Sequence, residues 1–302
     1  MSIATSTQAT AVHRPTVGAL SLSGRTSDYV EMCRPRIAVM TMLAVSAGFV
    51  LASPIVIQWS VLAVALAGIL QLVAASSMLN QVLEAGTDAR MERTADRALA
   101  AGRISRLEAT LVGLGLAISG VGILWLFTNP ATALGGILTL LVYVLVYTPL
   151  KTRSILCTTV GAVPGAMPPV LGWLAADGAG ASGAWSLFAI LFAWQFPHFL
   201  AIGWIHRQDY EMAGLKMLPS FSDGGRRAGI IAAIYSAAFI PVSLLPCYTG
   251  MTGRLYFATA MILSCLYFIS TARFALNRTT QRGRDLLLIS LTVLPLLFLV
   301  MV

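Results

Sequence analysis

The sequence predicts an all-α, polytopic membrane protein, a bundle of about nine transmembrane helices around a central cavity. Apolar residues make up 57% of the 302-residue chain and charged residues only 11%, whereas a soluble domain carries about a quarter charged residues. The mean hydropathy is +0.81. The run from Ile55 to Leu79 contains no charged residue, and about 20 apolar residues suffice to cross a bilayer.

The same length criterion predicts nine spans along the chain. They cover residues 36–53, 56–83, 107–127, 131–148, 155–175, 185–205, 228–248, 254–274 and 285–302. The fifth span is rich in helix-breaking residues, namely Gly161, Pro164, Gly165, Pro168, Pro169 and Gly172. We expect it to be bent or partly unwound, because freed backbone groups are tolerated in a membrane only where protein or a cavity satisfies them.

Two regions follow from this pattern: a tail over residues 1–27 and a transmembrane domain over residues 28–302. The tail is rich in Ser, Thr and Ala and has no apolar core. A signal peptide needs such a core, so we expect a disordered tail instead.

The net charge of +8 is distributed too unevenly to indicate nucleic-acid binding. Of the 20 Lys and Arg residues, 19 fall on one side of the predicted membrane, and only Arg254 falls on the other. The positive-inside rule then predicts a cytoplasmic N-terminus and an external C-terminus. Every acid except Asp177 also lies on the basic side. This suggests a polar site at the cytoplasmic face, although ordinary solvated loops would look similar.

The second span ends in three regularly spaced polar residues. Asn80, Glu84 and Asp88 stand at i, i+4 and i+8, so they share one face of a helix. Oxygen ligands arranged in this way suit Mg²⁺, which takes phosphate oxygens and water as its remaining ligands. We therefore predict that they bind a metal and act in catalysis. The alternative is a solvated helix end, but ionisable groups beside a long apolar run favour function.

A second acid, Asp209, follows the sixth span and is a fourth candidate metal ligand and catalytic residue. Basic residues near both acidic segments would neutralise a diphosphate leaving group. The candidates for diphosphate binding are Arg93, Arg97, Lys151 and Arg153. For each of them, orientation by the positive-inside rule is an equally good explanation.

Several runs carry a family resemblance. They are Asn80-x3-Glu84-x3-Asp88-x2-Met91-x-Arg93-Thr94-x2-Arg97, Arg34-Pro35-Arg36, Tyr147-Thr148-x2-Lys151, Gly161-Ala162-x-Pro164-Gly165, Trp194-Gln195-x-Pro197-His198-Phe199, Asp209-Tyr210 and Met217-Leu218-Pro219. In register over residues 28–220, the chain resembles the UbiA-type intramembrane prenyltransferases, in the branch that farnesylates heme. It departs from the family pattern at Glu84, Ala98, Thr152, Cys157 and His206. Two of these departures, Thr152 and Cys157, weaken the expected phosphate contacts in their loop.

The resemblance implies a Mg²⁺-dependent transfer of the farnesyl group of farnesyl diphosphate to a vinyl group of heme b, with addition of water, to give heme O and diphosphate. Heme b would be a substrate, not a cofactor. It also implies the bacterial inner membrane, and a heme A synthase or oxidase assembly factors as downstream partners. His198, with Trp194 and Phe199, is the candidate heme site. A continuous helix would place His198 about 16 Å deeper in the bilayer than Asp209.

Three other functions remain open. A related enzyme could prenylate a quinone precursor or a chlorophyllide, because the acceptor pocket cannot be read from a sequence. A transporter of an anionic substrate would also use broken helices, but it needs polar groups towards the outer face, where this chain is nearly uncharged. A non-catalytic assembly scaffold would not explain the acidic helix face.

Overall fold

The computed structural model describes residues 22–53, 56–178, 180–216 and 223–302. Every regular element in these ranges is helical, which confirms the predicted all-α class. In chain order the elements are α1 (Leu22–Met32), α2 (Pro35–Ala52), α3 (Trp59–Asp88), α4 (Arg106–Phe127), α5 (Pro130–Leu141), the π-helix η1 (Val142–Tyr147), α6 (Thr148–Leu150), α7 (Cys157–Ala166), α8 (Pro168–Ala175), α9 (Ala181–Ile205), α10 (Arg207–Met212), α11 (Arg226–Ser243), α12 (Leu245–Tyr248), α13 (Arg254–Leu276) and α14 (Thr280–Met301). The motif residues Met217-Leu218-Pro219 lie outside the described ranges.

Eight helical segments among the described residues are long and apolar enough to cross a membrane. The elements α5, η1 and α6 together form one of them, and α11 with α12 forms another. The remaining predicted span, residues 155–175, is divided between α7 and α8, which meet at Met167. Pro168 opens α8 at its first position, where the missing N–H of proline costs nothing. The break therefore falls where the prolines predict it.

Short polar side chains set the points at which several spans begin. Ser105 accepts a hydrogen bond from the Glu108 backbone N–H at the start of α4, and Asn129 accepts one from Thr132 at the start of α5. Thr279 caps α14 in the same way. Such caps satisfy backbone donors that a helix leaves unpaired at its first turn. Local sequence thus fixes where these helices begin.

The helix α1 lies against the loop that follows α3. It begins at Leu22, so residues 22–27 of the predicted tail are helical, while residues 1–21 lie outside the described ranges. Arg103 pairs with Asp28 at 2.8 Å, and Gln81 Nε2 donates to the Met32 carbonyl at 2.9 Å. These contacts hold α1 next to the polar end of α3.

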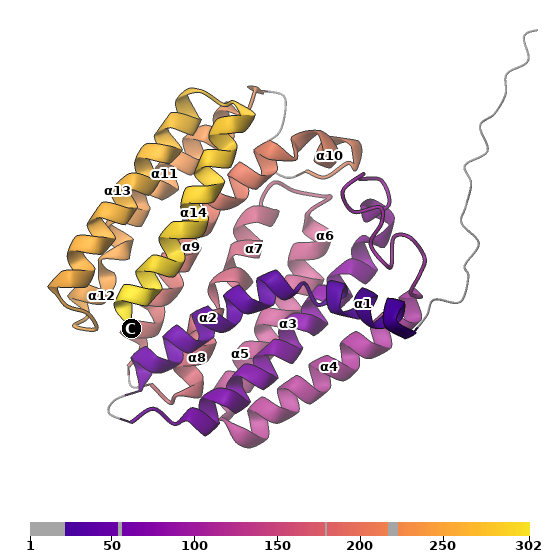
Figure 1. Ribbon diagram of the computed structural model, residues 1–302, viewed down its shortest axis with the longest axis horizontal. Coiled ribbons are helices and arrows are strands. Elements are labelled where there is room, and N and C mark those ends of the chain that lie inside the picture. Colours follow the sequence, from indigo (N-terminus) through magenta and orange to yellow (C-terminus); the bar gives the residue numbers. More distant parts are fainter. Residues whose placement is uncertain (1–21, 54–55, 179, 217–222) are drawn as a thin grey trace, which may run out of the picture.

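The helices form two groups, which are visible in Figure 1: α2 to α5 on one side, and α9, α11, α13 and α14 on the other, with α7 and α8 between them. Glycines allow the closest approach, between α2 and α8. A Cβ atom on Gly172 would lie 2.0 Å from the Val45 carbonyl oxygen, and one on Gly48 would lie 2.0 Å from that of Pro169. Small residues have this role in many membrane interfaces, because they let backbones touch.

We expect Gly172→Ala to destabilise the protein by about 1–3 kcal/mol, since the added methyl group must push two backbones apart. The measurement is the Tm of the detergent-solubilised protein. Gly115→Ala is the matched control, because a Cβ there would meet no atom within 4 Å, and alanine favours the helix. Equal Tm values for the two variants would contradict the assigned packing of α2 against α8.

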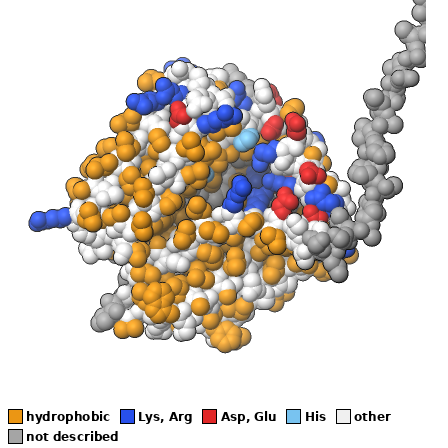
Figure 2. Space-filling model, in the orientation of Figure 1, with side chains coloured by type: hydrophobic (Ala, Val, Ile, Leu, Met, Phe, Trp, Pro, Cys, Tyr) orange, Lys and Arg blue, Asp and Glu red, His pale blue; other side chains and the backbone are white. Residues whose placement is uncertain are grey.

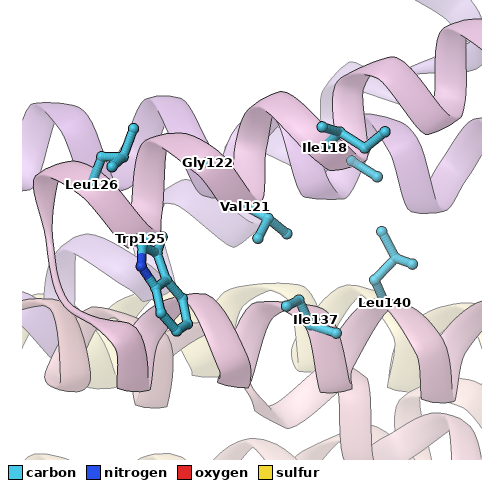
Figure 3. Close-up of a pocket in the computed structure, with 8 residues that line it drawn as sticks. Ile118, Val121, Gly122, Trp125, Leu126, Ile137 and Leu140 are labelled. Atoms are coloured by element: carbon cyan, nitrogen blue, oxygen red, sulfur yellow. The ribbon is translucent and has the colours of Figure 1, made fainter.

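An apolar cavity of about 520 Å³ lies between α4 and α5 (Figure 3). Val121 and Trp125 line it from α4, and Ile137 and Leu140 line it from α5. None of the predicted site residues lies on its wall. The cavity therefore has no part in the polar chemistry considered below.

Candidate active site

One face of α3 presents the three polar residues that the spacing singled out. The helix continues through Asp88, past Gly86 and Thr87. Asn80 and Asp88 are buried, at 0% and 2% exposure. Buried polar groups are costly unless they are hydrogen-bonded, so each should have a partner. The partners of Asn80 and Glu84 lie in the segment of residues 148–151, and the partner of Asp88 lies in the loop that follows α3.

Glu84 and Asp88 are each paired with a basic residue. Lys151 Nζ lies 2.7 Å from Glu84 Oε1, and Arg97 Nη1 lies 2.7 Å from Asp88 Oδ2. Both pairs are shielded from solvent, with side-chain exposures between 4% and 21%. Such an arrangement can separate on binding: a diphosphate attracts the two cations, and a metal ion attracts the two carboxylates.

The π-helix η1 and the short helix α6 that follows it carry two site residues, Tyr147 and Thr148, that the sequence reasoning did not assign. Thr148 Oγ1 accepts a hydrogen bond from Asn80 Nδ2 at 2.9 Å, and Lys151 Nζ lies 4.5 Å from the centre of the Tyr147 ring. Turns of π-helix within α-helices occur often at functional sites. For Tyr147, the sequence does contain a signal: Lys151 follows four residues later, and residues four apart on a helix are neighbours.

Arg34 is a third site residue that was missed, although it belongs to one of the motifs. It joins α1 to α2 with a left-handed backbone, at φ 51°. That conformation is strained for a residue other than glycine. It directs the guanidinium group to Asn80, whose Oδ1 lies 3.4 Å from Arg34 Nη2. Nothing in the sequence specifies this backbone conformation.

The helix α10 brings Asp209 to the same end of the molecule. The backbone N–H of Lys216 donates to the Lys151 carbonyl at 2.8 Å, which joins the segment after α10 to the basic loop. His206 Nδ1 lies 3.8 Å from Asp209 Oδ2. Burial lowers the pKa of His206 and the positive charge of Arg93 lowers it further, against the effect of Asp209. His206 is therefore mostly neutral at pH 7, so it does not neutralise Asp209.

The four predicted diphosphate-binding residues are not equally placed. Lys151 and Arg97 contact the acids of α3, and Arg93 lies close enough to His206 to affect its titration. Arg153 is exposed, and its side chain makes no hydrogen bond or ion pair with any residue that the structure describes. Figure 2 shows Lys and Arg side chains gathered at a hollow in the viewed face, with Asp and Glu side chains beside them.

The donor set fits a magnesium ion that arrives with its substrate. The predicted ligands Asn80, Glu84, Asp88 and Asp209 supply amide and carboxylate oxygens, which Mg²⁺ prefers. No group of three or more His, Cys, Asp or Glu able to hold a metal occurs within the described residues. The described residues therefore do not form a complete cage. Mg²⁺ typically takes one or two carboxylates from a protein and the rest from phosphates and water.

His198 lies on α9 among aromatic and hydroxyl groups. Its ring stacks on Trp194 with centroids 4.7 Å apart, and its Nδ1 lies 2.7 Å from Ser290 Oγ on α14. The ring of Phe199 is 5.7 Å away. Ser290 Oγ donates its single proton to the Leu287 carbonyl at 2.6 Å. It must therefore accept a proton from Nδ1, which leaves the lone pair of His198 on Nε2.

The helix break at His206 changes the expected depth of His198. The predicted depth of 16 Å requires one continuous helix as far as Asp209, but α9 ends at Ile205 and α10 begins at Arg207. His198 therefore lies about 10 Å, rather than 16 Å, from the end of its helix, because only the residues of α9 after His198 contribute to this distance. The correction leaves His198 on the membrane-spanning helix and Asp209 beyond its end.

The helical bundle, with acid–base pairs at one end, fits the class of intramembrane prenyltransferases. Residues 40–298 match the UbiA prenyltransferase family, and the chain belongs to that family. Two relatives are named protoheme IX farnesyltransferase. The chain is 40% identical to the one from Solibacter usitatus over 280 residues, which cover 90% of this chain and 96% of that protein. It is 41% identical to the one from Koribacter versatilis over 307 residues, which cover 98% and 97%.

Solved structures share the fold at low sequence identity. A digeranylgeranylglyceryl phosphate synthase superposes with a TM-score of 0.76 at 17% identity, covering 91% of this chain and 98% of that one. A UbiA homolog from Archaeoglobus fulgidus, bound to DMAPP and Mg²⁺, gives a TM-score of 0.68 at 18% identity, covering 91% and 99%. The protein is therefore a multi-pass integral membrane protein with the UbiA fold.

Proposed function

We propose that the protein transfers the farnesyl group of farnesyl diphosphate to a vinyl group of heme b, with addition of water, and releases heme O and diphosphate. The observation that carries this proposal is the pairing of Glu84 and Asp88 with Lys151 and Arg97 at one end of a membrane bundle. The names of relatives that are 40% and 41% identical over most of the chain support heme as the acceptor.

The polar end of the bundle would hold the diphosphate. Asn80, Glu84, Asp88 and Asp209 would bind Mg²⁺, which would neutralise phosphate charge as the allylic C–O bond breaks. Lys151 and Arg97 would exchange their carboxylate partners for phosphate oxygens. Arg93 would add a third cation, and Arg34, which now lies beside Asn80, is placed to do the same. Cations already held beside the bound diphosphate stabilise the charge that develops on the leaving group. Arg153 is exposed and has the weakest claim to this role.

The acceptor would lie deeper, beside His198. Its Nδ1–H is bonded to Ser290, so Nε2 is the atom that can ligate iron. An imidazole oriented by a hydrogen bond at its other nitrogen is the usual form of a histidine ligand. Trp194 is itself fixed, because its Nε1 donates to the Ser290 carbonyl at 2.9 Å. Trp194 and Phe199 would contact the porphyrin face and shield the farnesyl cation from water.

The other candidate functions have less support. A prenyltransferase acting on a quinone precursor or a chlorophyllide would share the diphosphate end, and only the acceptor region would differ. The relatives named protoheme IX farnesyltransferase favour heme over both. Transport of an anionic substrate has no support from the family that the chain matches. In a cell, the heme O product would pass to a heme A synthase or to oxidase assembly factors.

The reaction is tested with the purified full-length protein, heme b, farnesyl diphosphate and Mg²⁺. We expect a farnesylated heme that carries a new hydroxyl group, separated by chromatography and identified by its mass. Parallel reactions replace heme b with 4-hydroxybenzoate or with chlorophyllide, or replace Mg²⁺ with EDTA. Prenylation of either alternative acceptor in place of heme would assign the protein to another branch of the family. Full activity in EDTA would contradict the metal assignment.

We also propose that the N-terminus is cytoplasmic and the C-terminus external, in a bacterial inner membrane, because 19 of the 20 Lys and Arg residues fall on one side. A reporter fused after Val302 and one inserted at Gly178 should both be external. Alkaline phosphatase and green fluorescent protein fusions measure this, with an insertion at Arg153 as the cytoplasmic control. A cytoplasmic signal at both test positions would reverse the orientation.

A further inference from the structure

We propose that Thr148 is a positioning residue that fixes the side-chain amide of Asn80, so that the Asn80 oxygen, and not its nitrogen, faces the ions of the active site. The inference rests on the proposed function, because it concerns the end of the cavity that would hold Mg²⁺ and diphosphate. Nothing in the sequence motif distinguishes the two orientations of the amide.

The hydrogen bonds of Thr148 allow only one orientation. Its Oγ1 donates to the Tyr143 carbonyl at 2.8 Å. A hydroxyl group has a single proton, so towards Asn80 at 2.9 Å it can act only as an acceptor. The atom of Asn80 that meets Thr148 must then be the donor, Nδ2. Asn80 is 0% exposed and Thr148 is 4% exposed, so water does not compete for either group.

The π-helix determines which carbonyl accepts the Thr148 hydroxyl proton. Tyr143 stands five residues before Thr148, and its carbonyl accepts both the backbone N–H and the hydroxyl group of Thr148. In a regular α-helix the partner of that N–H would lie four residues back. The extra residue in the turn brings Tyr143 O and Thr148 Oγ1 together and commits the hydroxyl proton. Thr148 is thus left as an acceptor towards α3.

The other end of the amide faces positive charge. Asn80 Oδ1 lies 3.4 Å from Arg34 Nη2, and the next residue along the same face, Glu84, is bound to Lys151. A carboxamide oxygen is a ligand for hard cations, whereas its NH₂ group is a donor and repels them. Rotation of the amide by half a turn would therefore set two donors against each other at Arg34 and remove one oxygen ligand for Mg²⁺.

The test compares Thr148→Val, which keeps the shape but loses the acceptor, with Thr148→Ser, which keeps it. The probe is farnesyl S-thiolodiphosphate, an analogue that does not ionise readily, titrated calorimetrically into the full-length protein at a series of Mg²⁺ concentrations. We expect the Mg²⁺ concentration that gives half-maximal binding to rise about tenfold in Thr148→Val, as the loss of one buried hydrogen bond implies. We expect a change within about twofold in Thr148→Ser.

Thr271→Val is the matched control. Thr271 is also fully buried in a spanning helix, and its hydroxyl group also donates to a carbonyl of its own helix, that of Tyr267, at 2.8 Å. It makes no bond to Asn80. Its variant should bind the probe as the wild type does. If Thr148→Val does not purify as a monodisperse protein, Thr148→Cys, a weak acceptor, replaces it with the same expectation.

The same substitution made in an Asn80→Asp protein distinguishes loss of the amide orientation at position 80 from loss of packing around Thr148. An aspartate at position 80 has two equivalent oxygens, so it has no orientation to fix. In the Asn80→Asp protein, Thr148→Val should therefore cost less than about threefold. An undiminished tenfold cost in that background, or an equal loss in Thr148→Ser, would overturn the positioning role and leave the proposed function standing. Binding of the probe that does not depend on Mg²⁺ in the wild type would overturn the metal assignment and this inference together.

Discussion

Asp88→Asn and Asp209→Asn should each lower the rate of heme farnesylation by about 100-fold or more. Each change keeps the size of the side chain and removes one negative charge where a metal would bind. Loss of a single preorganised electrostatic contact typically costs 10²–10³ in rate. In Asp88→Asn the partner Arg97 also loses its carboxylate, although that side chain is 21% exposed and can turn to solvent. The measurement is kcat with both substrates saturating, over a range of Mg²⁺ concentrations.

Asp96→Asn is the matched control for these two variants. Asp96 lies in the same loop as Arg97, but its side chain is fully exposed, and its only ion pair among the described residues is with Arg103, at 3.3 Å. Exposed ion pairs of this kind contribute little, so activity should remain near that of the wild type. If Asp88→Asn and Asp209→Asn also retained normal turnover at limiting Mg²⁺, neither acid could be a metal ligand.

His198→Ala should abolish or strongly weaken heme binding and leave the affinity for farnesyl diphosphate nearly unchanged. The variant removes Nε2, the atom proposed to ligate iron, from a helix that ends before Asp209. Heme binding is followed by its absorption spectrum, and diphosphate binding by titration in the absence of heme. An opposite result, with normal heme binding and a weakened affinity for diphosphate, would show that the two ends of the cavity have been assigned the wrong way round.

Ser290→Ala tests the same site without removing the ligand. The variant frees Nδ1 of His198 from its only polar partner among the described residues, so the preferred tautomer is lost. Loss of such an outer partner typically costs 10–100-fold in metal affinity. We therefore expect a smaller loss of heme affinity than in His198→Ala, with a shifted spectrum. Thr292→Ala is the control, because Thr292 is exposed on the same helix and donates only to the Leu288 carbonyl.

The sequence was sufficient for the fold because a membrane leaves few structural options. Apolar length and one-sided charge define the spans, and clustered prolines mark the division between α7 and α8. The ends of the helices also depend on contacts between distant residues. The sequence predicts a tail as far as residue 27, whereas α1 begins at Leu22. Its contacts are long-range, such as the bond between Gln81 and the Met32 carbonyl. The helix propensity of residues 22–27 does not reveal these contacts.

Only part of the candidate site could be predicted from the sequence, because several of its contacts join residues that are far apart in the chain. Asn80, Glu84 and Asp88 could be grouped because helix periodicity is local. Their partners could not. Thr148 faces Asn80 because a π-helical turn shifts its register, and Arg34 does so because of a strained backbone at φ 51°. Neither feature follows from helix periodicity. Arg153 is close to the other candidates in sequence but is exposed in the fold, so its assignment to diphosphate binding stays a prediction.

The bond between the Lys216 backbone N–H and the Lys151 carbonyl joins two segments that are far apart in the chain, and neither side chain takes part. Mutation at position 151 or 216 can therefore change the chemistry of the site without separating the loops that carry it; only a proline at position 216 would remove the donor. The main chain therefore holds the segment after α10 against the loop at Lys151 whichever side chains stand at positions 151 and 216, so that the charge of the site and the position of its loops can be varied independently.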